Sequence, residues 1–142
     1  EIIVEGSRGV MVSLANCCKP VPGDHIVGYI TKTRGITIHR IECPNISDNK
    51  DDRKIEVSWG DRRSSCYQAR LKLEGADRPG LFADVAQAIS SLEGSIIQVR
   101  AFVAGGDRGR MTIDLQVRDL EHLYRIIAKL NSIKGVIEVL RG

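Results

Sequence analysis

Hydrophobic and polar residues alternate along "YQARLKLEG" at residues 67–75, where Ala69, Leu71 and Leu73 share one side. A period of two is typical of a strand with one buried face. The period changes in "RPGLFADVAQAISSLEG", which predicts a helix ending at Gly94, because glycine is suited to the residue after a helix. The apolar residues at helical spacing are Phe82, Val85, Ala86, Ile89 and Leu92.

Two strands, a second helix and a last strand follow. Residues 95–117 hold two alternating rows around the turn "AGGDRG", which predicts a hairpin. "DLEHLYRIIAKLNSIKG" predicts a helix with Asp119 as N-cap, Gly135 at its end and an apolar stripe of Leu120, Leu123, Ile127 and Leu130; "VIEVL" predicts a strand. With right-handed crossovers, the order βαββαβ gives an antiparallel sheet with both helices on one face, a ferredoxin-like domain.

Residues 1–65 lack this regularity and contain no segment that predicts a long amphipathic helix. A polar stretch, "DNKDDRKIEVSWGDRRSSCYQ", separates them from the C-terminal pattern. We therefore expect two domains, a small mainly-β module at 1–65 and a ferredoxin-like domain at 66–142. The fold class is α+β.

Composition narrows the function only slightly. The 142 residues are 42% hydrophobic and 27% charged, with a net charge of +3, which does not by itself predict nucleic-acid binding. Because there is no secretory leader and no apolar run of membrane-spanning length, we expect a cytoplasmic protein. The first residue is Glu1 rather than methionine, which suggests a piece of a longer protein.

The segment at residues 16–43 gathers three of the four cysteines and two of the three histidines. Three interpretations are open. A disulfide is the least favoured in a cytosolic chain, and adjacent Cys17 and Cys18 would bridge only with strain. Inert buried thiols are the second, since free cysteine is commonly buried. The third is a metal site, which would help a module too small to bury much apolar surface.

The spacing His39-x-x-x-Cys43 favours the metal site, because it brings an imidazole and a thiolate to one face. Cys17 and Cys18 can both contribute only if the chain turns there, and the prolines and glycine of residues 19–23 favour a turn. If one sulfur fails to reach the ion, His25 is the substitute ligand. From spacing alone, zinc and a packing role stay about equally supported.

The first strand-to-helix loop, "GADRPGLF", is the second candidate site. Asp77, Arg78, Pro79 and Gly80 lead into a helix whose free backbone N–H groups can meet a carboxylate. The alternative is that Asp77 caps the helix and Pro-Gly only makes the turn.

With the element order, the stretch "LEGADRPGLFADVAQAIS" resembles ACT domains, regulatory modules that pair side by side and often bind an amino acid between the partners. The resemblance implies a homodimer and an effector, such as a branched-chain amino acid, lying against Asp77, Arg78, Pro79, Gly80 and Leu81. The partner's second strand would supply its Ile97, Gln98 and Val99.

The segment "NCCKPVPGDHIVGYITKTRGITIHRIECPN" resembles the conserved-cysteine or zinc-finger module of long Rel/SpoT stringent-response proteins, which precedes an ACT domain. It departs at Thr33, where such sequences often carry glycine. The resemblance implies structural zinc on Cys17, Cys18, His39 and Cys43, with Cys66 outside the site. It also implies that the chain is not itself an enzyme, and that the parent, a GTP pyrophosphokinase or a (p)ppGpp hydrolase or both, has its catalytic domains elsewhere.

Such modules help to dock the protein on the ribosome beside uncharged tRNA. We therefore expect contacts to RNA phosphates from Lys32, Arg34 and Arg40, and Arg70, Lys72 and Arg100 also fall on the polar face of the predicted sheet. A solvated charged face is the alternative for these residues. The competing functions are an amino-acid sensor that tunes distant catalytic domains and a plain dimerisation module.

Overall fold

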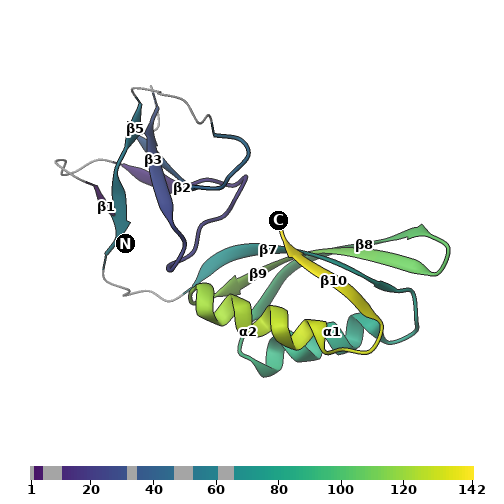
Figure 1. Ribbon diagram of the computed structural model, residues 1–142. Helices are drawn as coiled ribbons and strands as arrows, with labels where there is room; N and C mark the ends of the chain where they lie inside the picture. The colour runs from purple at the N-terminus through teal and green to yellow at the C-terminus, as the bar shows by residue number, and fades with distance from the viewer. Residues whose placement is uncertain (1, 5–10, 32–34, 47–52, 61–65) are drawn as a thin grey trace. The chain divides into compact units, whose positions relative to one another are not determined.

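A computed structural model describes residues 2–4, 11–31, 35–46, 53–60 and 66–142 (Figure 1). The chain divides into two compact units, Glu1–Ser65 and Cys66–Gly142. Each unit has its own sheet and core and is described separately. None of the helices in the described ranges is long and apolar enough to cross a membrane.

Short strands build the first unit, and no helix occurs among its described residues. A four-stranded sheet has the order β2-β4-β3-β5, in which β2 runs parallel to β4 and the other pairs are antiparallel. Its strands are β2 (Val12–Leu14), β3 (Ile26–Ile30), β4 (Ile36–Arg40) and β5 (Lys54–Ile55). A separate antiparallel pair joins β1 (Ile2–Val4) to β6 (Val57–Trp59).

The core of this unit is small. Ile36, Ile38 and Val57 are buried together, and five partly buried residues pack against them: Ile2, Val12, Leu14, Ile26 and Ile55. A second cluster of buried side chains consists of Ala15, Cys18 and Cys43, so it includes two of the cysteines expected to bind a metal. Two of its three members are thiols, so hydrophobic packing alone accounts for little of that region.

The second unit has the predicted order of elements and confirms the ferredoxin-like fold. Its sheet is antiparallel with the order β10-β7-β9-β8, and both helices lie on one face of it (Figure 1). The elements are β7 (Tyr67–Ala76), α1 (Leu81–Ser91), β8 (Ser95–Gly105), β9 (Arg108–Val117), α2 (Leu120–Asn131) and β10 (Val136–Arg141).

The helix faces that pack on the sheet differ in part from the predicted stripes. Phe82 is 49% exposed, because α1 begins at Leu81 and the buried stripe runs through Leu81, Val85, Ala88 and Ile89. In α2 the buried residues are His122, Leu123, Ile126 and Leu130. The expectation of a buried Phe82 was therefore wrong, and Ile126, which the pattern did not single out, is fully buried.

Gly94 serves packing more than backbone conformation. The left-handed residue after α1 is Glu93, with φ 66°, and the Gly94 N–H donates to the Ile89 carbonyl at 2.9 Å. A Cβ atom at position 94 would come within 2.9 Å of side-chain atoms of both Ile89 and Ile126. Glycine is needed here because α2 approaches the end of α1 closely.

Asp119 caps α2, as the sequence predicts, since its side chain accepts a hydrogen bond from the His122 N–H at 2.8 Å. Replacing Asp119 by alanine leaves that N–H without its cap and should lower the free energy of unfolding by about 1 kcal/mol. Chemical denaturation followed by circular dichroism measures the loss. Asp119→Asn is the matched control, because asparagine caps equally well; equal losses in the two variants would show that the charge, not the cap, matters.

Candidate functional site

A tight turn after β2 brings both neighbouring cysteines to one place. The Lys19 N–H donates to the Ala15 carbonyl at 3.0 Å, closing a single helical turn over Asn16, Cys17 and Cys18, and Lys19 takes a positive φ of 46°. On an extended strand, the two thiols would point to opposite faces. The turn removes that obstacle.

The other two donors come from β4 and the turn that follows it. Ile36 and Ile38 of β4 point into the core, so His39 lies on the opposite side of the strand. The Cys43 N–H donates to the Arg40 carbonyl at 3.0 Å, which folds the chain back after β4. The spacing of His39 and Cys43 therefore works through a strand end and a turn.

Four donor atoms converge at this point. Ligand atoms of Cys17, Cys18, His39 and Cys43 all lie within 4.8 Å of one another. The Cys17 Sγ is 3.5 Å from the His39 Nδ1 and 3.6 Å from the Cys43 Sγ, and the Cys18 Sγ is 3.8 Å from the same Nδ1. The group is also partly screened, because Cys18 and Cys43 are buried while Cys17 is exposed.

This geometry fits zinc. With Zn–S near 2.3 Å and Zn–N near 2.0 Å, the edges of a tetrahedral site measure about 3.7 Å between sulfurs and about 3.5 Å between sulfur and nitrogen. The observed separations are close to these values. Three thiols and an imidazole are also the donor set of a closed structural zinc site. The cluster could therefore hold a metal ion.

The thiols differ in their readiness to ionise. Burial raises the pKa of Cys18 to about 12. Burial also opposes ionisation of Cys17, but hydrogen bonds involving the side chains of Asn45, Cys43 and Cys18 outweigh it and hold the Cys17 pKa below its ordinary value. Burial lowers the pKa of His39, which favours the neutral imidazole that ligates a metal. A divalent cation would offset the cost of a buried thiolate at Cys18.

Other residues proposed for this unit lie away from the cluster or outside the described residues. His25 is exposed and is not among the four that converge. Only 12% of the Arg40 side chain is exposed, its guanidinium lies 3.5 Å from the Glu42 carboxylate, and its backbone N–H donates to the Cys18 Sγ at 3.3 Å. Arg40 thus supports the cluster more than it faces solvent. Lys32 and Arg34 fall outside the described residues.

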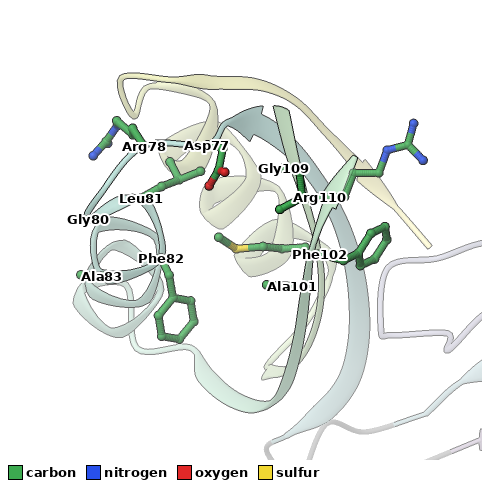
Figure 2. Close-up of a pocket in the computed structure, with 12 residues that line it drawn as sticks. Asp77, Arg78, Gly80, Leu81, Phe82, Ala83, Ala101, Phe102, Gly109 and Arg110 are labelled. Atoms are coloured by element: carbon green, nitrogen blue, oxygen red, sulfur yellow. The ribbon is translucent and has the colours of Figure 1, made fainter. Parts of the chain in front are cut away.

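The second candidate site is a pocket of about 460 Å³ between the start of α1 and the β8–β9 hairpin (Figure 2). Asp77 and Leu81 point toward this space. Gly80, with φ 86°, is the N-cap residue of α1, and no side chain caps the helix. The Leu81 N–H donates to the Arg78 carbonyl at 3.3 Å, so the N–H groups of Phe82 and Ala83 are the ones that can meet an anionic group of a ligand.

The Arg78 side chain points away from the pocket (Figure 2), although Arg78 is one of its lining residues. Its guanidinium donates to the Lys134 carbonyl at 3.0 and 2.8 Å and to the Asp84 carboxylate at 2.7 Å. These bonds tie the loop before α1 to the loop after α2. Pro79 precedes α1 instead of lying in its first turn and is not part of the pocket wall.

The strand side of this pocket is formed by the far half of the β8–β9 hairpin, whereas Ile97, Gln98 and Val99 were expected to close the site from a partner chain. Ile97, Gln98 and Val99 lie in the first half of β8, outside the pocket wall of the single chain. The residues that sequence reasoning missed belong to the start of α1 and the far half of the hairpin: Phe82, Ala83, Ala101, Phe102, Val103, Gly109, Arg110 and Met111. The predicted hairpin was the sequence feature that pointed to this region. In the structure, the Asp107 carbonyl of its turn accepts a hydrogen bond from the Asp77 N–H at 2.6 Å, which holds the hairpin beside the loop before α1.

Sequence comparison relates both units to known families. Residues 2–60 match the RelA/SpoT RIS domain, and residues 63–141 match the ACT domain. The GTP pyrophosphokinase of Myxococcus xanthus is 34% identical over 138 residues, which are 97% of this chain and 18% of the relative. That of Haemophilus influenzae is 35% identical over 145 residues, covering 99% and 19%. The bifunctional (p)ppGpp synthase/hydrolase RelA of Mycobacterium tuberculosis is 31% identical over 142 residues, covering 99% and 19%. The chain spans about a fifth of these relatives.

The cluster predicts a specific pattern of thiol protection. With one equivalent of zinc, Cys17, Cys18 and Cys43 should resist alkylation by iodoacetamide, while exposed Cys66 reacts and serves as the internal reference. After chelation, Cys17 should react first and Cys18 last. Because the Cys17 pKa is lowered, its thiolate and its reactivity should persist to a lower pH than in an ordinary thiol, whereas Cys18 stays protonated through neutral pH. Mass spectrometry of digests gives each rate, and equal labelling of all four thiols with zinc present would contradict the site.

Proposed function

We infer that this chain has a regulatory function. It belongs to the ACT domain family over residues 63–141. Together with the RelA/SpoT RIS match, this fits the C-terminal region of a Rel/SpoT protein. In this proposal, the chain docks a (p)ppGpp-metabolising protein on the ribosome beside deacylated tRNA. The catalytic domains of that protein lie outside the chain. Docking on the ribosome would place the protein in the cytoplasm.

The observation that carries the proposal is the convergence of Cys17, Cys18, His39 and Cys43 within the RIS match. Zinc at this point would link the turn after β2 to the end of β4 and the turn beyond it. The described core of this unit is small, so such a link would supply much of its folding free energy. A rigid module of this kind can hold basic side chains in position against RNA phosphates.

The charged residues proposed to contact RNA are Lys32, Arg34 and Arg40. Lys32 and Arg34 follow β3 in the sequence and precede β4, so they belong to the connection between the two central strands of the sheet. Arg40 ends β4, next to the cluster. Because Arg40 is mostly buried, Lys32 and Arg34 would make the larger contribution.

Ribosome cosedimentation with deacylated tRNA in the acceptor site tests this function. The chain should pellet with ribosomes, and binding should weaken as salt increases, because phosphate contacts release counterions. Arg34→Ala should reduce binding roughly tenfold at physiological salt. Cys43→Ser and His39→Ala should lose zinc, measured by atomic emission, together with ribosome binding.

Cys66→Ser is the matched control for Cys43→Ser, because Cys66 is exposed and lies outside the cluster. It should retain one zinc and full binding. Ribosome binding that survives the loss of zinc would place docking outside the first unit, and a stably folded, metal-free wild type would remove zinc from the proposal.

A second candidate function, amino-acid sensing in an ACT-domain homodimer, is favoured by the pocket at the start of α1. The uncapped first turn suits a carboxylate, the Asp77 carboxylate suits an ammonium group, and Leu81, Ala101 and Met111 offer an apolar wall. These features fit a small apolar amino acid such as a branched-chain one. The partner's second strand would close the site.

Thermal unfolding with added valine, leucine or isoleucine tests the sensor. A ligand at ten times its Kd should stabilise the second unit by about 1.4 kcal/mol, or roughly 6 °C or more. Asp77→Asn should abolish the shift, and so should Gly80→Val, which adds bulk at a left-handed residue. Asp107→Asn, an exposed residue of the hairpin turn, is the control that should keep it. No shift with any of the three ligands would leave the pocket without this role.

A further inference from the structure

The sheet of the second unit has a face that neither helix covers (Figure 1). Residues with even numbers in β7 and β9 project there, because Ala69, Leu71 and Leu73 of the same strand are buried on the other side. The uncovered face therefore carries long polar and charged side chains from the two central strands. We call it the open sheet face.

A hollow of about 260 Å³ on this face is lined by Arg70, Lys72, Gln98, Arg100, Thr112 and Asp114. The Arg70 guanidinium donates two hydrogen bonds to Asp114, at 2.7 and 3.1 Å, so this pair is neutral as a whole. Lys72 and Arg100 are exposed, and neither has an ion-pair partner in the described part of the chain. The hollow thus has an excess of two positive charges and is suited to a phosphate.

An exposed aromatic ring lies beside the hollow. Phe102 is 53% exposed, pairs with Arg110 in the β8–β9 register, and points with it to the side of the strands away from α1 (Figure 2). A second hollow of about 310 Å³ is lined by Phe102, Arg110 and Leu140 and shares Lys72 and Thr112 with the first. The aromatic and basic groups therefore belong to one continuous surface.

The spacing of these groups suits a nucleic acid strand. Phe102 and Arg100 are two residues apart on β8, so their side chains leave the same face about 7 Å apart. A base stacked on Phe102 would leave its neighbouring phosphate within reach of Arg100 and Lys72. Aromatic rings flanked by cations are the combination with which proteins bind single-stranded nucleic acids.

The carboxylates of the open sheet face do not reverse its charge. Glu74 is shared by Arg108 at 3.0 Å and Arg110 at 4.0 Å, and Asp114 is held by Arg70. Glu138 is the third acid along these hollows. Cations therefore remain in excess next to the aromatic ring. This charge favours a negatively charged strand and disfavours a basic partner.

We propose that the open sheet face of the second unit binds single-stranded RNA, with a base on Phe102 and backbone phosphates on Lys72 and Arg100. The inference rests on the proposed docking function and extends it, because it assigns an RNA contact to the second unit and to unpaired nucleotides. Duplex RNA fits less well, since its bases are stacked inside the helix and cannot reach Phe102.

Fluorescence anisotropy with a labelled 12-nucleotide oligouridylate and the zinc-loaded chain tests the proposal. The double variant Lys72→Ala/Arg100→Ala should bind roughly tenfold more weakly, and the slope of log affinity against log salt should fall by about 1.4. Phe102→Ala should lose roughly tenfold with an unchanged slope, and Phe102→Tyr should restore binding, because a stacking contact is lost and regained without a phosphate contact.

Arg125→Ala/Lys129→Ala is the matched control, since it also removes one arginine and one lysine, from exposed positions on α2. It should bind like the wild type. A duplex of the same length should bind more weakly than the single strand, and polyglutamate should compete poorly. Equal losses in the two double variants, or unchanged binding in Phe102→Ala, would overturn the proposal, and strong competition by polyglutamate would favour an acidic protein partner instead.

The two proposals fail separately. Ribosome cosedimentation that depends on Arg34 and zinc, together with no oligouridylate binding, would refute the open sheet face alone. Oligouridylate binding that depends on Phe102, without ribosome binding, would refute docking and leave an RNA-binding sheet.

Discussion

The convergence of four donor side chains at the turn after β2 is the constraint on which the first unit depends. Its described hydrophobic core is small, with Ile36, Ile38 and Val57 buried at its centre, and a module of this size gains limited stability from burial alone. The turn at Cys17 and Cys18 lies beside the end of β4, and the thiol and imidazole groups that meet there could hold a metal ion linking the two segments. Folding and metal binding would then be one event.

The second unit is stabilised by hydrophobic packing. Two helices cover one face of a four-stranded sheet, and the fully buried residues of β7, β9, α1 and α2 meet between them. This leaves two surfaces with different chemistry. The start of α1 and the hairpin form a mostly apolar pocket, whereas the open sheet face presents cations beside one aromatic ring. Phe102 is a lining residue of both the pocket and the hollow beside the open sheet face.

Much of this arrangement follows from the amino-acid sequence. The alternation in residues 67–75 and the helical spacing after it specify the βαββαβ order, because a period of two or of 3.6 decides which side chains share a face. Asp119 is recognisable as a cap from its place before an apolar run. The spacing of His39 and Cys43 also suggests that both side chains bind one metal ion, because a strand end followed by a turn keeps the two side chains close together.

The sequence by itself determined the order of elements, the two-part organisation and the candidate donors for a metal ion, because these depend on local periodicity and residue chemistry. Tertiary structure alone decided the rest. Arg78 turns from the pocket to the Lys134 carbonyl, Phe82 is left outside the core, and Gly94 is required by the approach of Ile126. Each of these results depends on which segment, far away in the sequence, packs against the residue. The local pattern of residues carries no information about such contacts.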